Sequence, residues 1–118
     1  MAITSFEQLD VWKISHRLTL DVYDYTKSLP DDEKYGLMSQ MRRSAVSVPA
    51  NIAEGFKKRG SKDKVRFYNI AQGSLEELRY YFILCRDLNY LKVNDEQLIV
   101  FDTIGKMLNS LQKKILRT

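Results

Sequence analysis

Apolar residues recur every three or four positions along four segments of the chain. In the first segment they are Val11, Ile14, Leu18, Val22, Tyr25 and Leu29. This spacing brings the apolar side chains onto one face of a helix. The helix is expected to start near Ser5, with Glu7 and Gln8 in its first turn as hydrogen-bond acceptors. Pro30 ends it, because the residue before a proline avoids the helical region.

The second segment predicts a helix that has Asp31 or Asp32 as its N-cap and continues through Pro49. Its apolar positions are Met38, Met41, Ala45, Val48, Ile52 and Phe56. A proline inside a helix costs about 3 kcal/mol relative to alanine. Because the pattern keeps its register across Pro49, we expect one helix with a kink there. The alternative is a break at Ser47, which could cap a new helix.

Gly60 is expected to end this second helix, and Ser61 to cap the third. The third helix has two apolar faces. One contains Tyr68, Ala71, Leu75, Leu78, Phe82 and Cys85, and the other contains Phe67, Ile70, Ser74, Tyr81, Leu84, Leu88 and Leu91. One face can pack inside a bundle, whereas an exposed second face is typical of an interaction surface. The pattern therefore indicates an oligomer.

The fourth segment predicts a helix capped by Asn94 or Asp95. Its stripe is Leu98, Phe101, Ile104, Leu108, Leu111 and Ile115. Gly105 within it could allow a neighbouring helix to approach closely, and Lys113, Lys114 and Arg117 suit the negative end of the helix dipole. Four such helices with short links predict an all-α fold, an antiparallel up-down-up-down four-helix bundle. We expect residues 1–118 to form one domain.

The positive charge is concentrated in one stretch. The chain has a net charge of +4, but residues 41–66 hold eight basic and two acidic residues, a net of +6, and the remainder has a net of −2. The basic residues are Arg42, Arg43, Lys57, Lys58, Arg59, Lys62, Lys64 and Arg66. A patch of this kind is typical of a surface that binds a polyanion. A solvated turn between helices gives the same pattern.

The residue types needed for catalysis or metal binding are scarce. The chain has one histidine, His16, and one cysteine, Cys85, so no zinc-binding set is expected. No phosphate-binding glycine loop or nucleophile elbow is present. We therefore predict no enzyme activity, no catalytic residue, no cofactor and no metal. The chain has neither a secretory signal pattern nor an apolar run of the ~18 residues that span a bilayer, so a cytoplasmic protein without membrane contact is expected.

Three polar residues lie beside the apolar stripes of the second and third helices. Asn51 and Glu54 are three residues apart and share a helix face, and Ser74 lies on the third helix. Buried polar groups need hydrogen-bond partners. We interpret Asn51, Glu54 and Ser74 as a structural polar network that ties these two helices together.

Three runs of the sequence resemble a known family. They are FEQLDVWKISHRL, YGLMSQMRRSAVSVPANIAEGF and IAQGSLEELRYY. Together they resemble the bacterial four-helix-bundle proteins encoded in intervening sequences of ribosomal RNA genes, which are also described as ribosomal-protein-like. That family is similar to the accessory variability proteins of diversity-generating retroelements. The resemblance implies a ring-shaped homopentamer and nucleic-acid binding through a basic surface.

Two functions from different classes follow. The first is a non-enzymatic, oligomeric protein that binds RNA or DNA through the eight cations named above. The aromatic residues near them, including Phe67 and Tyr68, are expected to be packing residues. The second is a scaffold for a protein partner such as a reverse transcriptase, in which an acidic cluster contacts the basic stretch of a neighbouring subunit. This cluster is Asp21, Asp24, Asp31, Asp32 and Glu33. A bundle that binds a small molecule or metal is a third, weaker alternative.

Overall fold

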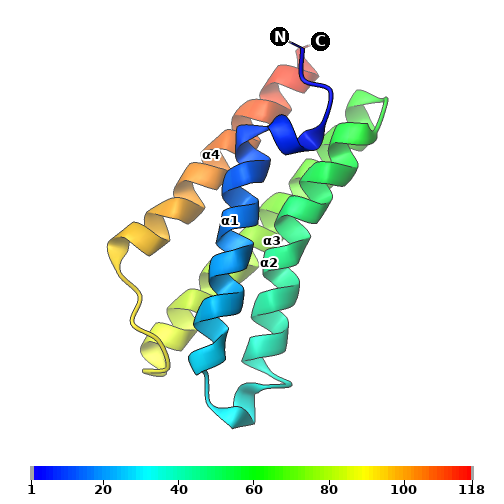
Figure 1. Ribbon diagram of the computed structural model, residues 1–118. Coiled ribbons are helices and arrows are strands. Elements are labelled where there is room, and N and C mark those ends of the chain that lie inside the picture. The colour runs from blue at the N-terminus through cyan, green and yellow to red at the C-terminus, as the bar shows by residue number, and fades with distance from the viewer. Residues whose placement is uncertain (1, 118) are drawn as a thin grey trace.

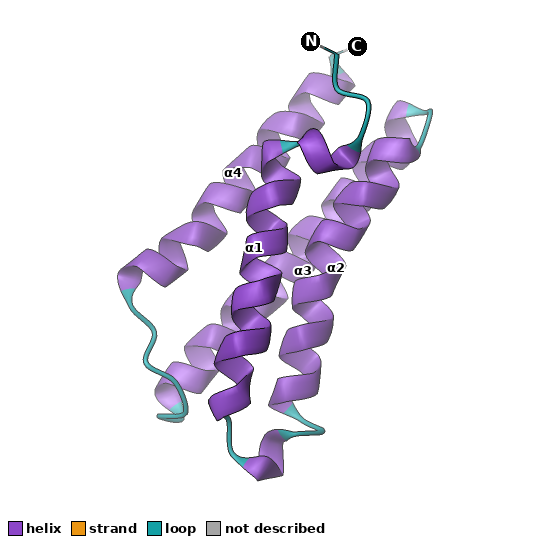
Figure 2. Ribbon diagram, in the orientation of Figure 1, coloured by secondary structure: helices purple, strands orange, loops and turns teal. Residues whose placement is uncertain are grey.

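A computed structural model describes residues 2–117, which form four α-helices joined by short connections. The helices are α1 (Asp10–Tyr25), α2 (Leu37–Lys57), α3 (Ser61–Asp87) and α4 (Asp95–Leu116). Successive helices run in opposite directions (Figure 1), and no strand occurs in the described range (Figure 2). The bundle measures 47 × 26 × 23 Å. The predicted all-α four-helix bundle is confirmed.

The core consists of the apolar stripes that the sequence pattern predicts. The predicted inner face of α3 is buried along its whole length, from Tyr68 to Cys85. The ring of Phe82 packs edge-on against Tyr25 and Phe101, with ring centroids 6.1 and 5.1 Å away. Such edge-to-face pairs add stability beyond the burial of their area. The helices are thus held by one continuous apolar core.

The first helix begins later than predicted. Ser5 and Gln8 form a capping box, but the turn that they cap, Phe6–Gln8, is a 3-10 turn. Leu9 is extended, with φ −73° and ψ 126°, so the α-helix starts only at Asp10. A second 3-10 turn, Thr26–Ser28, follows α1 and leads to Pro30. The predicted region is therefore helical in three pieces.

The prediction that Asp31 or Asp32 caps the second helix is wrong. Asp31–Glu33 forms a separate 3-10 turn, and α2 begins after Gly36, whose backbone is not helical (φ −109°, ψ −108°). The Glu33 carboxylate accepts a hydrogen bond from the Leu37 backbone N–H at 3.3 Å. Glu33 therefore provides the capping acceptor from four residues before the helix.

Helix α2 continues through Pro49 without a break. The alternative in which Ser47 caps a new helix is therefore wrong. Pro49 itself is buried, and so are Val48 and Ile52 beside it. Packing on the same apolar stripe before and after the proline keeps the register that the sequence pattern indicates. The kink at Pro49 stays a prediction.

The ends of α3 and α4 follow from local sequence. Gly60, rather than the predicted Ser61, occupies the N-cap of α3. At the other end, Asn89 adopts φ 61°, and the Tyr90 N–H donates to the Cys85 carbonyl at 2.9 Å. This is the geometry of a Schellman motif, which asparagine tolerates. Asn94 caps α4 in a capping box with Gln97, so that prediction is confirmed.

The antiparallel topology determines which connection lies at which end of the bundle. The α2–α3 turn, the N-terminal segment and the last turns of α4 lie at one end (Figure 1). The α1–α2 connection lies at the opposite end, and the α3–α4 connection starts there. This arrangement decides which charged residues become neighbours.

Candidate nucleic-acid interface

The most basic part of the chain is the tip between α2 and α3. We call residues Lys57 to Arg66 the basic turn. Helix α2 ends at Lys57, and Lys58 is extended with its N–H donating to the Gly55 carbonyl at 3.3 Å. Helix α3 starts at Ser61 after Gly60, so only three residues link the two helices. A tight link of this kind presents its cations at a corner, where they are well solvated.

Close packing just below the tip fixes how α2 meets α3. Gly55 faces Tyr68, and a Cβ added to Gly55 would lie 2.7 Å from Tyr68 Cε1. Tyr68 is only 2% exposed, so its ring cannot move aside easily. Burial also raises the pKa of the Tyr68 hydroxyl. The glycine of the SVPANIAEG run therefore has a packing role at the base of the basic turn.

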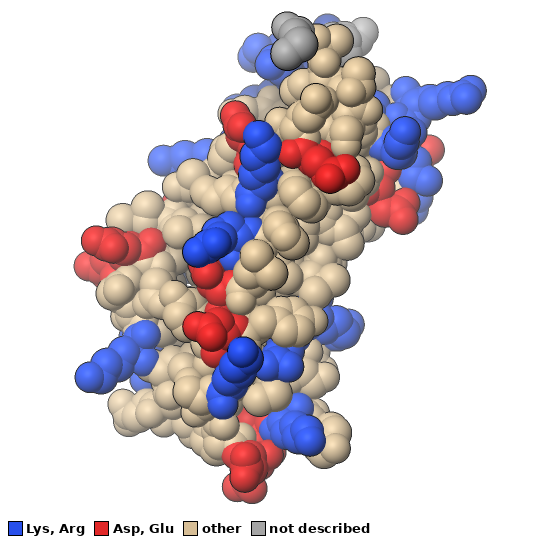
Figure 3. Space-filling view, in the orientation of Figure 1, with Lys and Arg blue, Asp and Glu red and all other residues tan. Residues whose placement is uncertain are grey.

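Three cations of the basic turn are exposed and uncommitted. Within the described chain, the side chains of Lys57, Arg59 and Lys62 form neither a hydrogen bond nor an ion pair. Figure 3 shows the blue side chains of this corner projecting at the upper right, close to a few acidic residues. Free, solvated cations on a convex corner are suited to contact phosphate groups.

Two further cations of the basic turn pack on an aromatic ring. The ammonium of Lys58 lies 5.0 Å from the centroid of Phe67, and the guanidinium of Arg66 lies 4.9 Å from it. Lys58 also pairs weakly with Glu54, at 4.0 Å on the surface. Such contacts are worth about 1 kcal/mol or less each at exposed sites, so they leave both cations available to a ligand.

Lys64 has a structural contact that the sequence did not predict. Its ammonium donates to the backbone carbonyls of Phe56, at 2.7 Å, and Gly55, at 3.3 Å. These carbonyls are in the last turn of α2, where no backbone N–H of the helix is left to donate to them. Lys64 therefore closes the C-terminal end of α2, and much of its charge is used within the chain.

Arg42 and Arg43 are not brought together with the basic turn. Arg42 is 15 residues before Lys57 on α2, which corresponds to about 22 Å along the helix. Arg42 Nε donates to Thr26 Oγ1 at 2.9 Å, and its guanidinium lies over Tyr23, 4.7 Å from the centroid. Arg43 is exposed and donates to Gln40 at 2.8 Å. Arg42 ties the end of α1 to α2.

The polar residues between α2 and α3 form hydrogen bonds that include two of the three predicted members. Asn51 Nδ2 donates to the Ser47 carbonyl at 2.8 Å, and the hydroxyls of Ser47 and Ser74 lie 2.7 Å apart. A second link runs from the Ser44 hydroxyl to the Glu77 carboxylate. Glu54 is exposed, pairs only with Lys58 and lies outside these links. The links hold α2 to α3.

The sequence interpretation did not place a second group of cations at the same end of the bundle as the basic turn. They are Lys106, Lys113, Lys114 and Arg117 on α4. Because α4 runs antiparallel to α3, its C-terminal turns lie at the same end as the basic turn (Figure 1). We call residues 2–10, 54–66 and 106–117 the basic end: they hold ten basic and four acidic residues, a net of +6, against −2 for the remainder. The predicted up-down-up-down topology already implies that the end of the fourth helix lies at the same end of the bundle as the turn between the second and third helices.

The groups that could support other chemistry are isolated. Residues 2–117 contain no group of three His, Cys, Asp or Glu side chains that could hold a metal ion. His16 is exposed and stacks on Trp12, with ring centroids 4.8 Å apart. Cys85 is fully buried, and burial raises the pKa of its thiol to about 11. None of the described helices is long and apolar enough to cross a bilayer.

Comparison with known proteins supports the family resemblance and the fold. The family model of the 23S rRNA-intervening sequence protein matches residues 7–110. A crystal structure from Bacteroides thetaiotaomicron, described as a protein of unknown function from the S23 ribosomal protein family, is similar with a TM-score of 0.75 and 26% identity. The match covers 87% of this chain and 95% of that one. The comparison with curated proteins gives no match.

Proposed function

Because the chain belongs to the 23S rRNA-intervening sequence protein family, we propose that it is a non-enzymatic, ring-forming protein of the cytoplasm that binds RNA or DNA. One observation carries the proposal: the tight α2–α3 turn presents five accessible cations. They are Lys57, Lys58, Arg59, Lys62 and Arg66. Residues 54–66 contain two acidic residues, Glu54 and Asp63, against these cations. Phosphate groups are the ligands that such a cluster attracts most strongly.

The aromatic residues of the site support contact with the backbone rather than with bases. Lys58 and Arg66 lie over the ring of Phe67, and Lys64 lies 5.5 Å from the centroid of Phe56. Both rings are half-buried. A base could stack on either ring only by displacing these cations. We therefore expect little preference for base sequence.

Exposed apolar side chains on two different faces of the molecule support a ring. The outer face of α3 carries Ile70 and Leu88, which are 44% and 45% exposed. Between α1 and α2, Tyr23 and Val46 line a shallow hollow and are also exposed. Two different faces of one chain favour a head-to-tail contact, which closes into a ring when the rotation allows. The number of subunits in the proposed homopentamer comes from the family resemblance. A ring repeats the basic turn and so increases affinity through multivalency.

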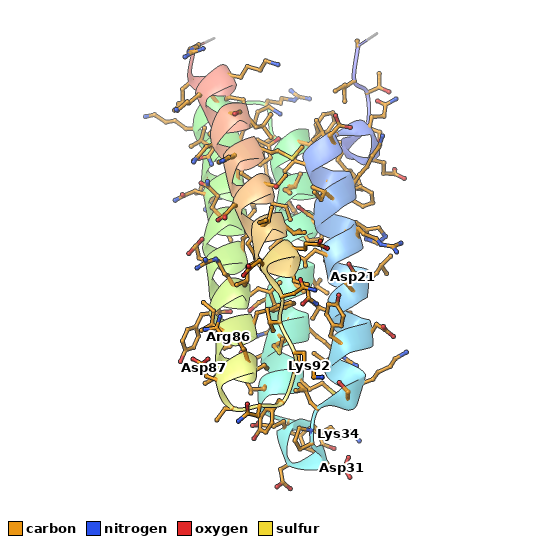
Figure 4. All side chains as sticks on the ribbon, turned by 90° about the vertical axis from the view of Figure 1, so that its left-hand side faces the viewer. Asp21, Asp31, Lys34, Arg86, Asp87 and Lys92 are labelled. Carbon is orange, nitrogen blue, oxygen red and sulfur yellow. The ribbon has the colours of Figure 1, made fainter. Side chains whose placement is uncertain are left out.

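A salt titration of RNA and DNA binding tests the proposal. We expect the logarithm of the affinity to fall steeply and linearly with the logarithm of salt concentration. The variant Lys57→Glu/Lys58→Glu/Arg59→Glu should lose binding while its mass in solution stays that of the wild type. The matched control, Lys27→Glu/Arg86→Glu/Lys92→Glu, changes two exposed lysines and one exposed arginine away from the basic end, and Arg86 and Lys92 are labelled in Figure 4. Weak binding that salt does not change would contradict the proposal.

A scaffold for a protein partner, such as a reverse transcriptase, is the second candidate. The hollow between α1 and α2 favours it, because exposed Tyr35 and Tyr23 lie there beside Lys34 and Arg43. Aromatic and arginine side chains are enriched where proteins bind each other. If the basic turn serves assembly instead of nucleic acid, the triple glutamate variant should weaken the oligomer itself. The acidic residues Asp31–Glu33 lie at the end of the bundle opposite the basic turn (Figure 4). A contact between them and the basic turn of a neighbouring subunit would therefore require that subunit to be displaced along the bundle axis.

A further inference from the structure

A second basic feature of the molecule is a groove between the N-terminal segment and the end of α4. Its volume is about 690 Å³. Ile3, Leu9, Met107 and Leu111 contribute apolar surface. The charged residues that line it are Lys106, Lys113, Lys114, Arg117 and a single acid, Asp10. The groove therefore combines an apolar surface with an excess of three positive charges.

The four cations of the groove are not paired with an acidic side chain of the described residues. Within residues 2–117, none of Lys106, Lys113, Lys114 and Arg117 takes part in an ion pair, even with Asp10. The helix dipole explains cations only in the last turn of a helix. Lys106 precedes the end of α4 by ten residues, so the dipole does not account for it. These cations are therefore free to interact with an external anion.

We propose that this groove binds the phosphodiester backbone of the same nucleic acid that contacts the basic turn. The inference rests on the proposed function and extends its site from one turn to the whole basic end. The cations extend over residues 106–117, about 16 Å along α4. That length suits several successive phosphates of a strand, spaced about 3.4 Å along a helix axis, better than one small anion. The apolar surface can face sugars or unpaired bases.

Neutral substitutions in the groove provide the first test. The variant Lys113→Gln/Lys114→Gln/Arg117→Gln removes three of its four charges. For a single-stranded probe, the salt slope should fall by about 0.7 for each phosphate that the variant no longer neutralises. The matched control is Lys27→Gln/Arg86→Gln/Lys92→Gln, which should keep the wild-type slope. A single-stranded and a duplex probe of equal length show which form of the backbone the groove accepts.

The outcomes separate this inference from the proposed function. If the wild type shows no salt-dependent binding, both are wrong. If the basic-turn variant loses binding but the groove variant behaves like its control, the proposed function stands and the groove inference is overturned. If the salt slope falls for the groove variant and not for the control, the inference is supported.

A fluorescent label gives a second test that keeps every cation in place. Ser110 lines the groove and is exposed, so Ser110→Cys accepts a thiol-reactive dye. The native Cys85 is fully buried and should not react. The emission of the dye at position 110 should change when the single-stranded probe binds. The same dye on Ser28→Cys, away from the basic end, should not respond, and equal responses at both positions would overturn the inference.

Discussion

Thr19 Oγ1 lies 3.0 Å from the carbonyl oxygen of Ala45, the acceptor that Pro49 leaves without its helical donor. In a regular helix the N–H of residue 49 would donate to this carbonyl, and proline has no N–H. The Thr19 hydroxyl is also 3.0 Å from the Ser15 carbonyl, which has a helical donor of its own. Donation to Ala45 is therefore the more useful bond. Helix α1 therefore supplies the hydrogen-bond donor that Pro49 removes from α2, and this helps α2 to continue through the proline.

Thr19→Val tests this relationship, because valine keeps the shape and removes the donor. The Ala45 carbonyl would stay buried without a partner, so we expect the free energy of unfolding to fall by about 1–3 kcal/mol. In a Pro49→Ala background the same change should cost clearly less, because the new N–H of residue 49 can donate. Urea denaturation of the four proteins gives the coupling energy.

Thr103→Val is the control for this cycle. Thr103 donates to the Ile99 carbonyl on the exposed side of α4, so removing its hydroxyl should cost a few tenths of a kcal/mol at most. An equal cost of Thr19→Val with and without Pro49 would show that the two residues are not coupled.

Gly55→Ala should destabilise the bundle although alanine is the better helix former. The added Cβ would overlap the Tyr68 ring, and overpacking costs about 1–3 kcal/mol. The gain in helix propensity, about 1 kcal/mol, offsets part of this cost. Gly73→Ala is a matched comparison on α3, where an added Cβ meets nothing within 4 Å. We expect Gly73→Ala to raise the melting temperature and Gly55→Ala to lower it; the same sign for both would refute this packing argument.

Lys64→Met should reduce stability rather than nucleic-acid affinity. Methionine keeps the apolar stem but cannot donate to the Gly55 and Phe56 carbonyls. Bonds from a charged donor contribute about 1.5–3 kcal/mol, and partial exposure brings the expected loss to about 1 kcal/mol. Lys62→Met is the control: it should leave the urea midpoint unchanged and lower the affinity. Reversed outcomes for the two lysines would mean that Lys64 is a phosphate ligand.

The buried thiol of Cys85 should make the fold less stable at high pH. Its pKa in the folded chain is about 11, against an ordinary value of 9.0. Between these values the unfolded chain loses the proton while the folded chain keeps it, so rising pH favours unfolding. Urea midpoints from pH 8 to 10.5 should therefore fall more steeply for the wild type than for Cys85→Ala. Tyr68 also has a raised pKa and contributes equally to both proteins, so parallel curves would contradict the prediction.

The periodic pattern predicted the fold because burial follows from spacing alone. The inner face of α3, from Tyr68 to Cys85, is buried as predicted, and Asn94 caps α4. The starts of α1 and α2 were less predictable. They depend on the extended backbone of Leu9 and on the unusual conformation of Gly36, and neither residue type requires these conformations.

The candidate site was predicted only in part, because a sequence does not show how far a long side chain reaches. Lys64 and Arg42 looked like their neighbours in the basic stretch, yet both donate to carbonyls that the tertiary fold brings near. The sequence suggested Gly105 as the site of a close helix approach. An added Cβ there meets Leu75 at an ordinary 3.9 Å, and the close approach is at Gly55.

The length of the bundle gives its two ends separate electrostatic surroundings. The molecule is 47 Å long, whereas charges in a solution of physiological ionic strength are screened over about 8 Å. A polyanion arriving at the basic end therefore meets a local charge of +6 and does not sense the acidic turn at the other end. The overall charge of +4 describes neither end. An approaching strand should be oriented before it makes its first contact. A ring of parallel subunits would attract the strand at the rim formed by the basic ends and not at the opposite rim.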